Sequence, residues 1–378
     1  MMSSFLLAFA VSLLTTLLVV HAASAIGGAY LDHDTSGPQK FHARPVPRIG
    51  GVGIFAGLVA AGVAMTWWEP AARNPALQLL ICGLPALGMG LIEDFTKRVS
   101  PAKRLVATAV SAALAILMLD ASVTRTDIPG LDWFVAFALG ATLVTIFAVA
   151  GIANSVNIID GFNGLASMCA VLMLMSLAYV AFEVGDRTVA LLALAGVGAV
   201  LGFFIWNFPA GLIFLGDGGA YFLGFYVAEV AILLLHRNPS VSPLFPLLVV
   251  IYPVFETVFS IYRRRVLRAV APSVPDGIHL HSLIYRRVMR WAIGSRGARS
   301  LTRRNSMTSP YLWALCMLSV VPAVLFWNNS LLLSLFLFLF ALSYLTLYWR
   351  IVRFKSPRWL RFGPSRHPWV ARADNPHP

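Results

Sequence analysis

The chain has 378 residues, of which 58% are hydrophobic and only 12% are charged. A typical soluble domain has about 25% charged residues, so this composition excludes an ordinary soluble protein. The apolar residues lie in long runs, and a run of about 18 or more residues indicates a helix that spans a membrane. The composition therefore predicts an all-α, polytopic membrane protein. It argues against a porin-like barrel, whose strands would give short alternating segments.

The net charge is +13, from 29 Lys and Arg against 16 Asp and Glu. In a soluble protein this excess would favour nucleic acid as a partner, but a membrane protein carries basic loops on its cytoplasmic side without any such ligand. We therefore expect no nucleic-acid partner. The three cysteines, Cys82, Cys169 and Cys316, all lie in apolar runs, which predicts neither a disulfide framework nor a metal cluster.

Eleven apolar segments have the length of a membrane span. They cover approximately residues 3–24, 50–68, 76–93, 104–121, 133–153, 164–184, 188–206, 219–235, 244–262, 310–327 and 331–350. With the N-terminus outside and the C-terminus cytoplasmic, 25 of the 29 basic residues fall in cytoplasmic segments, and this asymmetry predicts the orientation.

Residues 1–350 are thus expected to form one multi-span domain, and residues 351–378 a basic cytoplasmic tail. The cytoplasmic loops of that domain are predicted at about residues 25–49, 94–103, 154–163, 207–218 and 263–309. The first span could be a signal peptide, because Ala23-Ser24-Ala25 resembles a cleavage site. No Lys or Arg precedes Ser3, however, so we expect this helix to be retained.

Polar residues near membrane depth are costly and tend to mark a site, and five cytoplasmic segments carry them. In the first, Lys40, His42 and Arg48 precede the second span, where backbone N–H groups at a helix start favour phosphate. The alternative is an ordinary basic loop. In the second, Glu93 and Asp94 end the third span, where the helix dipole disfavours carboxylates unless a metal or a lysine is close. The alternative there is a solvated acidic pair.

The third segment has a polar residue at every third position: Asn154, Asn157, Asp160 and Asn163. In a helix these side chains would form one polar stripe. The stripe contains no Lys or Arg and lies between two apolar spans, which favours a ligand site. The alternative is that the amides join helices to each other.

The fourth segment places Asp217 before two glycines at the start of a span, where it could cap the helix or bind Mg²⁺ together with a substrate phosphate. The fifth contains His279, His281 and Arg286. Histidines two positions apart do not share a helix face, so a helical zinc site is disfavoured and a phosphate clamp is favoured. The alternative is a basic loop on lipid headgroups.

The five segments together supply oxygen ligands for Mg²⁺ and cations for phosphates on one face of the membrane. This combination is typical of phosphoryl transfer, and the apolar setting favours a lipid as one substrate. At these residues the chain resembles the polyprenyl-phosphate N-acetylhexosamine-1-phosphate transferases of glycosyltransferase family 4. That family includes undecaprenyl-phosphate GlcNAc-1-phosphate transferases and phospho-MurNAc-pentapeptide translocases. The resemblance covers about residues 30–310, and segments 154–166 and 214–224 are its most specific parts.

The resemblance implies transfer of an N-acetylhexosamine-1-phosphate, with GlcNAc favoured, from a UDP-sugar to undecaprenyl phosphate. UMP would be released and a lipid-linked glycan begun, in the cytoplasmic (inner) membrane of a bacterium. Membrane lipids, and a second copy of the chain in a homodimer, are further partners compatible with it. The alternatives are a phospho-MurNAc-pentapeptide translocase, a silent lipid-binding homologue and a transporter. A transporter would place its ligands nearer the middle of the membrane.

The resemblance also implies a role for each motif residue. Asp217 would be the ligand of Mg²⁺, with Mn²⁺ as an alternative metal. The implied catalytic residues are Glu93, Asp94, Asp160 and Asn163. The implied substrate-binding residues are Lys40, His42, Arg48, Asn154, Asn157, His279, His281 and Arg286. The chain departs from the family pattern at Glu93, Asn163 and Glu256, where Asp is common, and at Ser282, where many members have His.

Overall fold

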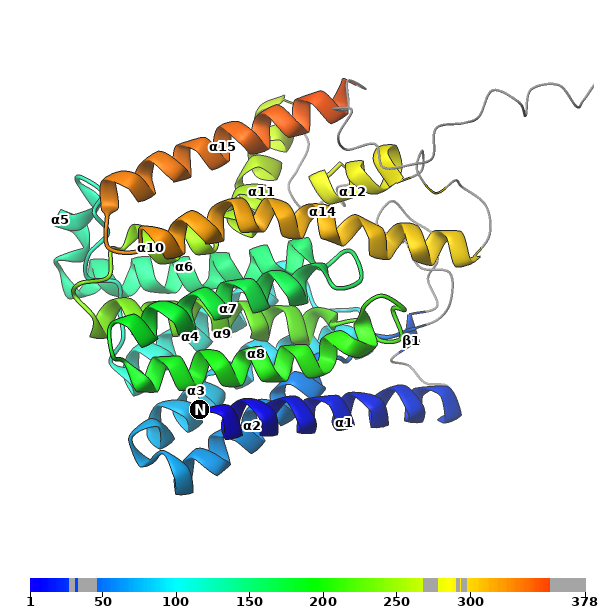
Figure 1. The fold of residues 1–378 in the computed structure, drawn as a ribbon, viewed down its shortest axis with the longest axis horizontal. Coiled ribbons are helices and arrows are strands. Elements are labelled where there is room, and N and C mark those ends of the chain that lie inside the picture. Colours follow the sequence, from blue (N-terminus) through cyan, green and yellow to red (C-terminus); the bar gives the residue numbers. More distant parts are fainter. Residues whose placement is uncertain (27–30, 33–45, 268–277, 290–292, 294–297, 354–378) are drawn as a thin grey trace, which may run out of the picture.

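The computed structural model describes residues 1–26, 31–32, 46–267, 278–289, 293 and 298–353. Within these ranges the chain is a bundle of long helices that lie side by side along one direction (Figure 1). Two strands of two residues each, β1 (Leu31–Asp32) and β2 (Val46–Pro47), pair antiparallel at one end of the bundle. This architecture confirms the predicted all-α class.

Ten helices of the described part are long and apolar enough to cross a membrane. They are α1 (Met2–Ile26), α2 (Gly51–Trp68), α3 (Pro70–Thr96), α4 (Pro101–Leu119), α6 (Ala138–Ile159), α7 (Leu165–Glu183), α8 (Arg187–Asn207), α9 (Gly216–Arg237), α14 (Ala298–Leu325) and α15 (Ser330–Val352). The shorter elements are α5 (Leu131–Val135), α10 (Leu244–Val249), α11 (Ile251–Tyr262), α12 (Leu280–Leu283) and the π-helical turns η1 (Arg263–Leu267) and η2 (Ile284–Met289).

The predicted span over residues 244–262 is divided into α10 and α11, with a break at Val250. Pro253 has no N–H to donate to the carbonyl oxygen four residues earlier, which weakens the helix at this point. The pair still runs from one end of the bundle to the other. Ser242, just before α10, contacts Ser330 at the start of α15, whereas Glu256 of α11 contacts His279. The α10–α11 pair therefore crosses the bundle once, in addition to the ten long helices of the described chain.

Helix α9 is the centre of the bundle, and its candidate span is completely buried. Glycines let neighbouring backbones approach it closely. A Cβ atom on Gly224 would lie 2.5 Å from Cα of Ala153 in α6, and one on Gly90 of α3 would lie 2.5 Å from Cα of Gly218. Small residues at such contacts are typical of helix packing in membranes. This packing fixes the N-terminal end of α9 against α3 and α6.

Helix α1 packs against α8 and α2 as an integral part of the bundle (Figure 1). Its backbone passes so close to α8 that a Cβ atom on Gly202 would lie 2.5 Å from the carbonyl oxygen of Phe9. The Ser12 hydroxyl donates a hydrogen bond of 2.6 Å to the carbonyl oxygen of Ala199, and the Trp206 indole donates to that of Leu13. The first predicted span is thus a packed helix, while the side of the membrane that it starts from stays a prediction.

The contact between α1 and α8 can be tested with two matched glycine substitutions. Gly202→Ala places a Cβ atom against the α1 backbone, so we expect the melting temperature of the purified protein to fall by about 2–5 °C. Gly151→Ala on α6 is the control, because no atom lies within 4 Å of the Cβ position there. Thermal unfolding in detergent measures both. Equal melting temperatures for the two variants would contradict the observed packing of α1.

Candidate active site

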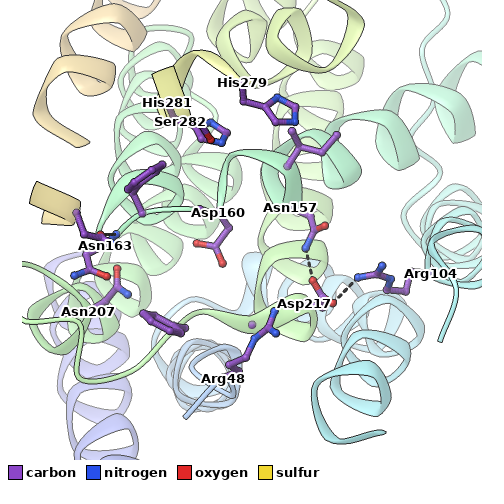
Figure 2. Close-up of a pocket in the computed structure, with 16 residues that line it drawn as sticks. Arg48, Arg104, Asn157, Asp160, Asn163, Asn207, Asp217, His279, His281 and Ser282 are labelled. Carbon is purple, nitrogen blue, oxygen red and sulfur yellow. Dashed lines mark hydrogen bonds and ion pairs between the residues drawn. The ribbon is translucent and has the colours of Figure 1, made fainter. Parts of the chain in front are cut away.

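The site is a cavity of approximately 390 Å³ at the end of the bundle where α3, α6, α8 and α15 end and α2, α4, α7, α9 and α14 begin. Figure 2 shows that its side chains converge from elements far apart in the sequence. The lining residues are Arg48, Arg104, Asn157, Ile158, Asp160, Gly161, Phe162, Asn163, Asn207, Phe214, Gly216, Asp217, His279, His281, Ser282 and Asn305. The lining thus combines residues of the third, fourth and fifth polar segments with Arg48 of the first and with Arg104, which follows the acidic pair of the second.

Asp217 lies in the first turn of α9 and is held by partners from two other helices (Figure 2). Its Oδ1 atom accepts a hydrogen bond of 2.6 Å from the Asn157 amide of α6, and its Oδ2 atom forms an ion pair with Arg104 of α4. The side chains of Arg104 and Asp217 are only 12% and 14% exposed, so this pair is well shielded from solvent. Such pairing is needed where a carboxylate lies at membrane depth.

Asp94 caps the helix that carries Asp217. Its carboxylate oxygens accept hydrogen bonds from the backbone N–H groups of Asp217, at 2.8 Å, and of Gly218, at 2.9 Å. The side chain is buried, and the positive end of the α9 dipole favours its charged form. The sequence left Asp217 with competing capping and ligand roles. The structure gives the capping role to Asp94, which leaves the Asp217 carboxylate directed toward the cavity.

Gly216 makes this arrangement possible. It has a φ of +78°, and a Cβ atom there would lie 1.8 Å from the carbonyl oxygen of Arg48. The segment before α2 is joined to the same turn, because the N–H of Gly50 donates to the carbonyl oxygen of Phe214 and that of Phe214 donates to Pro47. These backbone hydrogen bonds place Arg48 in the cavity wall beside the start of α9.

Asp160 follows the last residue of α6 and points into the cavity (Figure 2). Burial raises the pKa of this carboxyl to about 7, while the Arg48 guanidinium lowers it and the Asp217 carboxylate raises it further. A carboxyl whose pKa lies near neutral pH inside a cavity is typical of a functional site.

His279 and His281 lie in the cavity wall across from Asp217, with their rings stacked at 13° and their centroids 5.1 Å apart. Both side chains are buried. The Nδ1 atom of His279 lies 3.0 Å from the Glu256 carboxylate of α11, and the rings of Phe162 and His281 form a T-shaped contact. Both histidines of the predicted phosphate clamp therefore line the cavity, and phosphate binding by them stays a prediction.

Asn163 acts as a connector between α7, α8 and α14. Its backbone N–H donates to the Asn305 side chain at 2.8 Å, and its amide nitrogen donates to the carbonyl oxygen of Pro209 at 3.2 Å. The Ser309 hydroxyl donates a hydrogen bond of 2.6 Å to the backbone carbonyl oxygen of Asn163. An aspartate could not donate to Pro209, which gives a physical reason for Asn at this position.

The four polar residues of the third segment do not form one helical stripe, because α6 ends at Ile159. Asn157 is within the helix and faces Asp217, whereas Asp160 and Asn163 reach the cavity from the turn that follows. Asn154 accepts a hydrogen bond of 3.0 Å from the Tyr221 hydroxyl of α9. This contact is the helix-joining role that the sequence left open for an amide.

Four of the other predicted site residues lie outside the cavity or outside the described residues. Glu93 accepts a hydrogen bond of 2.6 Å from the backbone N–H of Val99, and so stabilises the turn between α3 and α4. Arg286 is exposed in η2 and does not line the cavity. Lys40 and His42 lie outside the described residues.

The sequence missed Arg104, Asn207, Asn305 and the connection of Glu256 to His279. Arg104 was counted only as one of several loop charges, although its place one turn into a helix that follows the acidic pair was a usable signal. Asn207 accepts a hydrogen bond of 2.6 Å from the N–H of Gly164. This contact joins segments that are distant in the sequence, so no local pattern could predict it.

The donor set of the cavity suits a metal that arrives with a substrate. No group of three or more His, Cys, Asp or Glu side chains in the described ranges could hold an ion alone. Mg²⁺ commonly binds through one or two carboxylates together with substrate phosphates. Asp217, Asp160 and the carbonyl of the Asn157 amide supply hard oxygen donors of this kind, so the residues present fit a magnesium–nucleotide complex.

Comparison with known proteins places this chain in a family of glycosyl transferases. Residues 76–235 match the model of glycosyl transferase family 4. A probable undecaprenyl-phosphate N-acetylglucosaminyl 1-phosphate transferase of Bacillus subtilis is 30% identical over 275 residues, which cover 72% of this chain and 75% of that protein. The undecaprenyl-phosphate α-N-acetylglucosaminyl 1-phosphate transferase of Thermotoga maritima is 27% identical over 265 residues, or 69% and 75% of the two chains.

A phospho-N-acetylmuramoyl-pentapeptide-transferase of a Geobacillus strain is 29% identical over a shorter stretch, 207 residues, which cover 52% of this chain and 64% of that enzyme. These matches confirm the resemblance stated above. The chain belongs to glycosyl transferase family 4, and it is a multi-pass glycosyl-1-phosphate transferase.

The raised pKa of Asp160 predicts a pH-dependent stability. Below its ordinary value of 3.8 the carboxyl is protonated in both the folded and the unfolded chain. As the pH rises toward about 7, only the folded chain keeps the proton, so the free energy of unfolding falls through this range and stays lower above it.

Asp160→Asn should therefore raise the melting temperature of the substrate-free, metal-free protein at pH 8 by about 2–5 °C. The gain should shrink toward zero as the pH approaches 4. Thermal unfolding at a series of pH values measures it. A variant that is less stable than the wild type at pH 8 would contradict the partly buried, poorly solvated position of Asp160.

Proposed function

We propose that the chain transfers GlcNAc-1-phosphate from UDP-GlcNAc to undecaprenyl phosphate, in a reaction that requires Mg²⁺ and releases UMP. The observation that carries the proposal is the Asp217 cluster. The Asp217 carboxylate, in the first turn of the buried helix α9, pairs with Arg104 and Asn157 and lines a cavity that two histidines also line. The names of the two relatives with the longer matches support the substrates. The product would begin a lipid-linked glycan in the inner membrane of a bacterium.

The chemistry is a displacement at phosphorus. An oxygen of the lipid phosphate forms a bond to the β-phosphorus of UDP-GlcNAc, and the bond from that phosphorus to the oxygen bridging the two phosphates breaks. UMP leaves with the electron pair, and the lipid keeps a diphosphate bearing the sugar. A phosphate monoester is already largely ionised at neutral pH, since its second pKa is about 6. The protein therefore needs to position the two phosphates rather than to abstract a proton.

The residues of the cavity divide these tasks by charge. Arg48 and the two histidines face the space where phosphate oxygens would lie, and arginine binds such oxygens with two hydrogen bonds. Asp217, Asp160 and Asn157 would hold Mg²⁺, or Mn²⁺ as an alternative, which when bound neutralises charge on the nucleotide diphosphate. Asp94 acts through the position of Asp217, and Glu93 through the turn that places Arg104.

A phospho-MurNAc-pentapeptide donor is the second candidate, because relatives with that name match 52% of the chain. The GlcNAc donor is preferred because the two relatives carrying its name match over a longer stretch. Ser282 adds to this preference. It lines the cavity at a position where the translocase pattern has a further histidine.

The reaction itself is tested with purified protein, undecaprenyl phosphate, Mg²⁺ and a panel of nucleotide sugars. We expect UMP and a lipid-linked product from UDP-GlcNAc, and no UMP when either the lipid or the metal is omitted. Measurement of UMP release and of the extracted lipid gives the result. Product from UDP-MurNAc-pentapeptide alone would replace the GlcNAc assignment by the second candidate.

Asp217→Asn should lower the turnover number by about 100-fold or more, because it removes the carboxylate charge that binds the metal and keeps the shape of the side chain. Glu229→Gln is a matched control, since Glu229 lies on the same helix, is completely buried and does not line the cavity. UMP release at saturating substrates measures both variants. Wild-type turnover by Asp217→Asn, at any Mg²⁺ concentration, would reject the metal assignment.

A further inference from the structure

Glu256 is a buried carboxylate that touches the catalytic cavity only through another residue. It lies on α11, is 1% exposed and is absent from the cavity wall. One of its oxygens lies 3.0 Å from Nδ1 of His279 and also accepts the backbone N–H of Leu280 at 3.0 Å. The other accepts the Tyr344 hydroxyl of α15 at 2.7 Å. Both oxygens of this carboxylate are therefore engaged.

This geometry decides which ring nitrogen of His279 carries a proton. A carboxylate can only accept hydrogen bonds, so Nδ1 must be the donor in its contact with Glu256. The other ring nitrogen, Nε2, lies on the opposite edge of the ring, and His279 lines the cavity. A carboxylate behind a functional histidine commonly fixes both its tautomer and its orientation.

The backbone around His279 is held from the same side. Arg263, the first residue of η1 directly after α11, donates a hydrogen bond of 2.6 Å to the carbonyl oxygen of Ile278, and it also donates to the Tyr348 hydroxyl of α15. The residues before and after His279 are thus bonded to Arg263 and Glu256. Two tyrosines one turn apart on α15, Tyr348 and Tyr344, bond in turn to these two side chains. The ring has little freedom to turn away from the cavity.

We propose that Glu256 and Tyr344 are positioning residues, which hold His279 so that Nε2 meets a phosphate oxygen of the nucleotide sugar. The identity of that oxygen rests on the proposed function, whereas the positioning itself does not. Helix α15 then contributes to the active site, although it supplies no residue to the cavity wall. The proposal predicts that these two residues act only through His279.

Two conservative substitutions test the proposal. Glu256→Gln keeps the shape of the side chain but removes the charge, and Tyr344→Phe keeps the ring that packs on Phe255 and Phe259. We expect kcat/KM for UDP-GlcNAc to fall by about 10- to 100-fold in Glu256→Gln, with a smaller fall in Tyr344→Phe. The KM for undecaprenyl phosphate should stay within about twofold, because the proposed contact of His279 is with the nucleotide sugar and not with the lipid phosphate.

Each variant has a matched control. Tyr226→Phe deletes a buried hydroxyl whose hydrogen bond, to the carbonyl oxygen of Leu192, also measures 2.7 Å. Glu229→Gln replaces a buried carboxyl group of α9 outside the site. Both controls should keep the wild-type kcat/KM. A fall in the controls as large as in the test variants would overturn the proposal, because loss of any buried polar group would then explain it.

The double variant separates positioning from a structural role. In a His279→Ala background, Glu256→Gln should cause no further loss of kcat/KM, because residues that act as a unit are not additive. Losses that multiply would overturn the proposal. If the wild type releases no UMP from any donor, the proposed function fails and a second readout still decides.

That readout is the rate at which diethylpyrocarbonate modifies His279, measured by mass spectrometry. Loss of the contact with Glu256 lets the ring change its tautomer and orientation, so Glu256→Gln and Tyr344→Phe should change the rate at least twofold relative to their controls. An unchanged rate in both variants would overturn the positioning of His279 whatever the enzyme's donor is.

Discussion

The capping of α9 by Asp94 is the interaction on which the site depends. A helix that begins inside an apolar bundle has backbone N–H groups that water cannot reach, and each must find a partner in the protein. Asp94 of α3 supplies that partner for Asp217 and Gly218. Because the cap comes from another helix, the side chain of Asp217 itself can turn to Arg104, Asn157 and the cavity. The cap that the start of α9 requires therefore also determines where the Asp217 carboxylate lies.

The charges around this cap are arranged so that no carboxylate is buried alone. Asp94 meets the positive end of α9, Asp217 meets Arg104, and Asp160 has Arg48 near it. Removing one partner from such a pair leaves an uncompensated charge, which costs far more than the pair contributes. Glycines at the contacts between α3, α6 and α9 keep these groups within reach, because a larger residue would separate the backbones. Close packing and charge pairing thus depend on each other here.

The sequence predicted the spans and the polar segments well, because a charge or an amide inside an apolar run is a local signal. It could not predict the cap, since Asp94 and Gly218 are 124 positions apart. The single polar stripe that a helix through Asn163 would give does not form, because α6 ends at Ile159 and the turn carries Asp160. The contact of Tyr344 with Glu256 could not be predicted from the sequence for a different reason. Tyr344 lies in a segment that reads only as a membrane span, and its function appears only once α15 is placed beside α11.

The departures from the family pattern at Glu93 and Asn163 take on a different meaning in the structure. Glu93 bonds the turn before α4, and Asn163 uses its amide to donate to Pro209 in a connection that an aspartate could not make. Neither residue supplies a charge to the cavity centre, where Asp160 and Asp217 lie (Figure 2). The two exchanges therefore alter the frame around the site and leave its carboxylates in place. They give no ground for regarding the chain as a silent homologue, because such a protein would have lost the groups that face the substrate rather than those that support them.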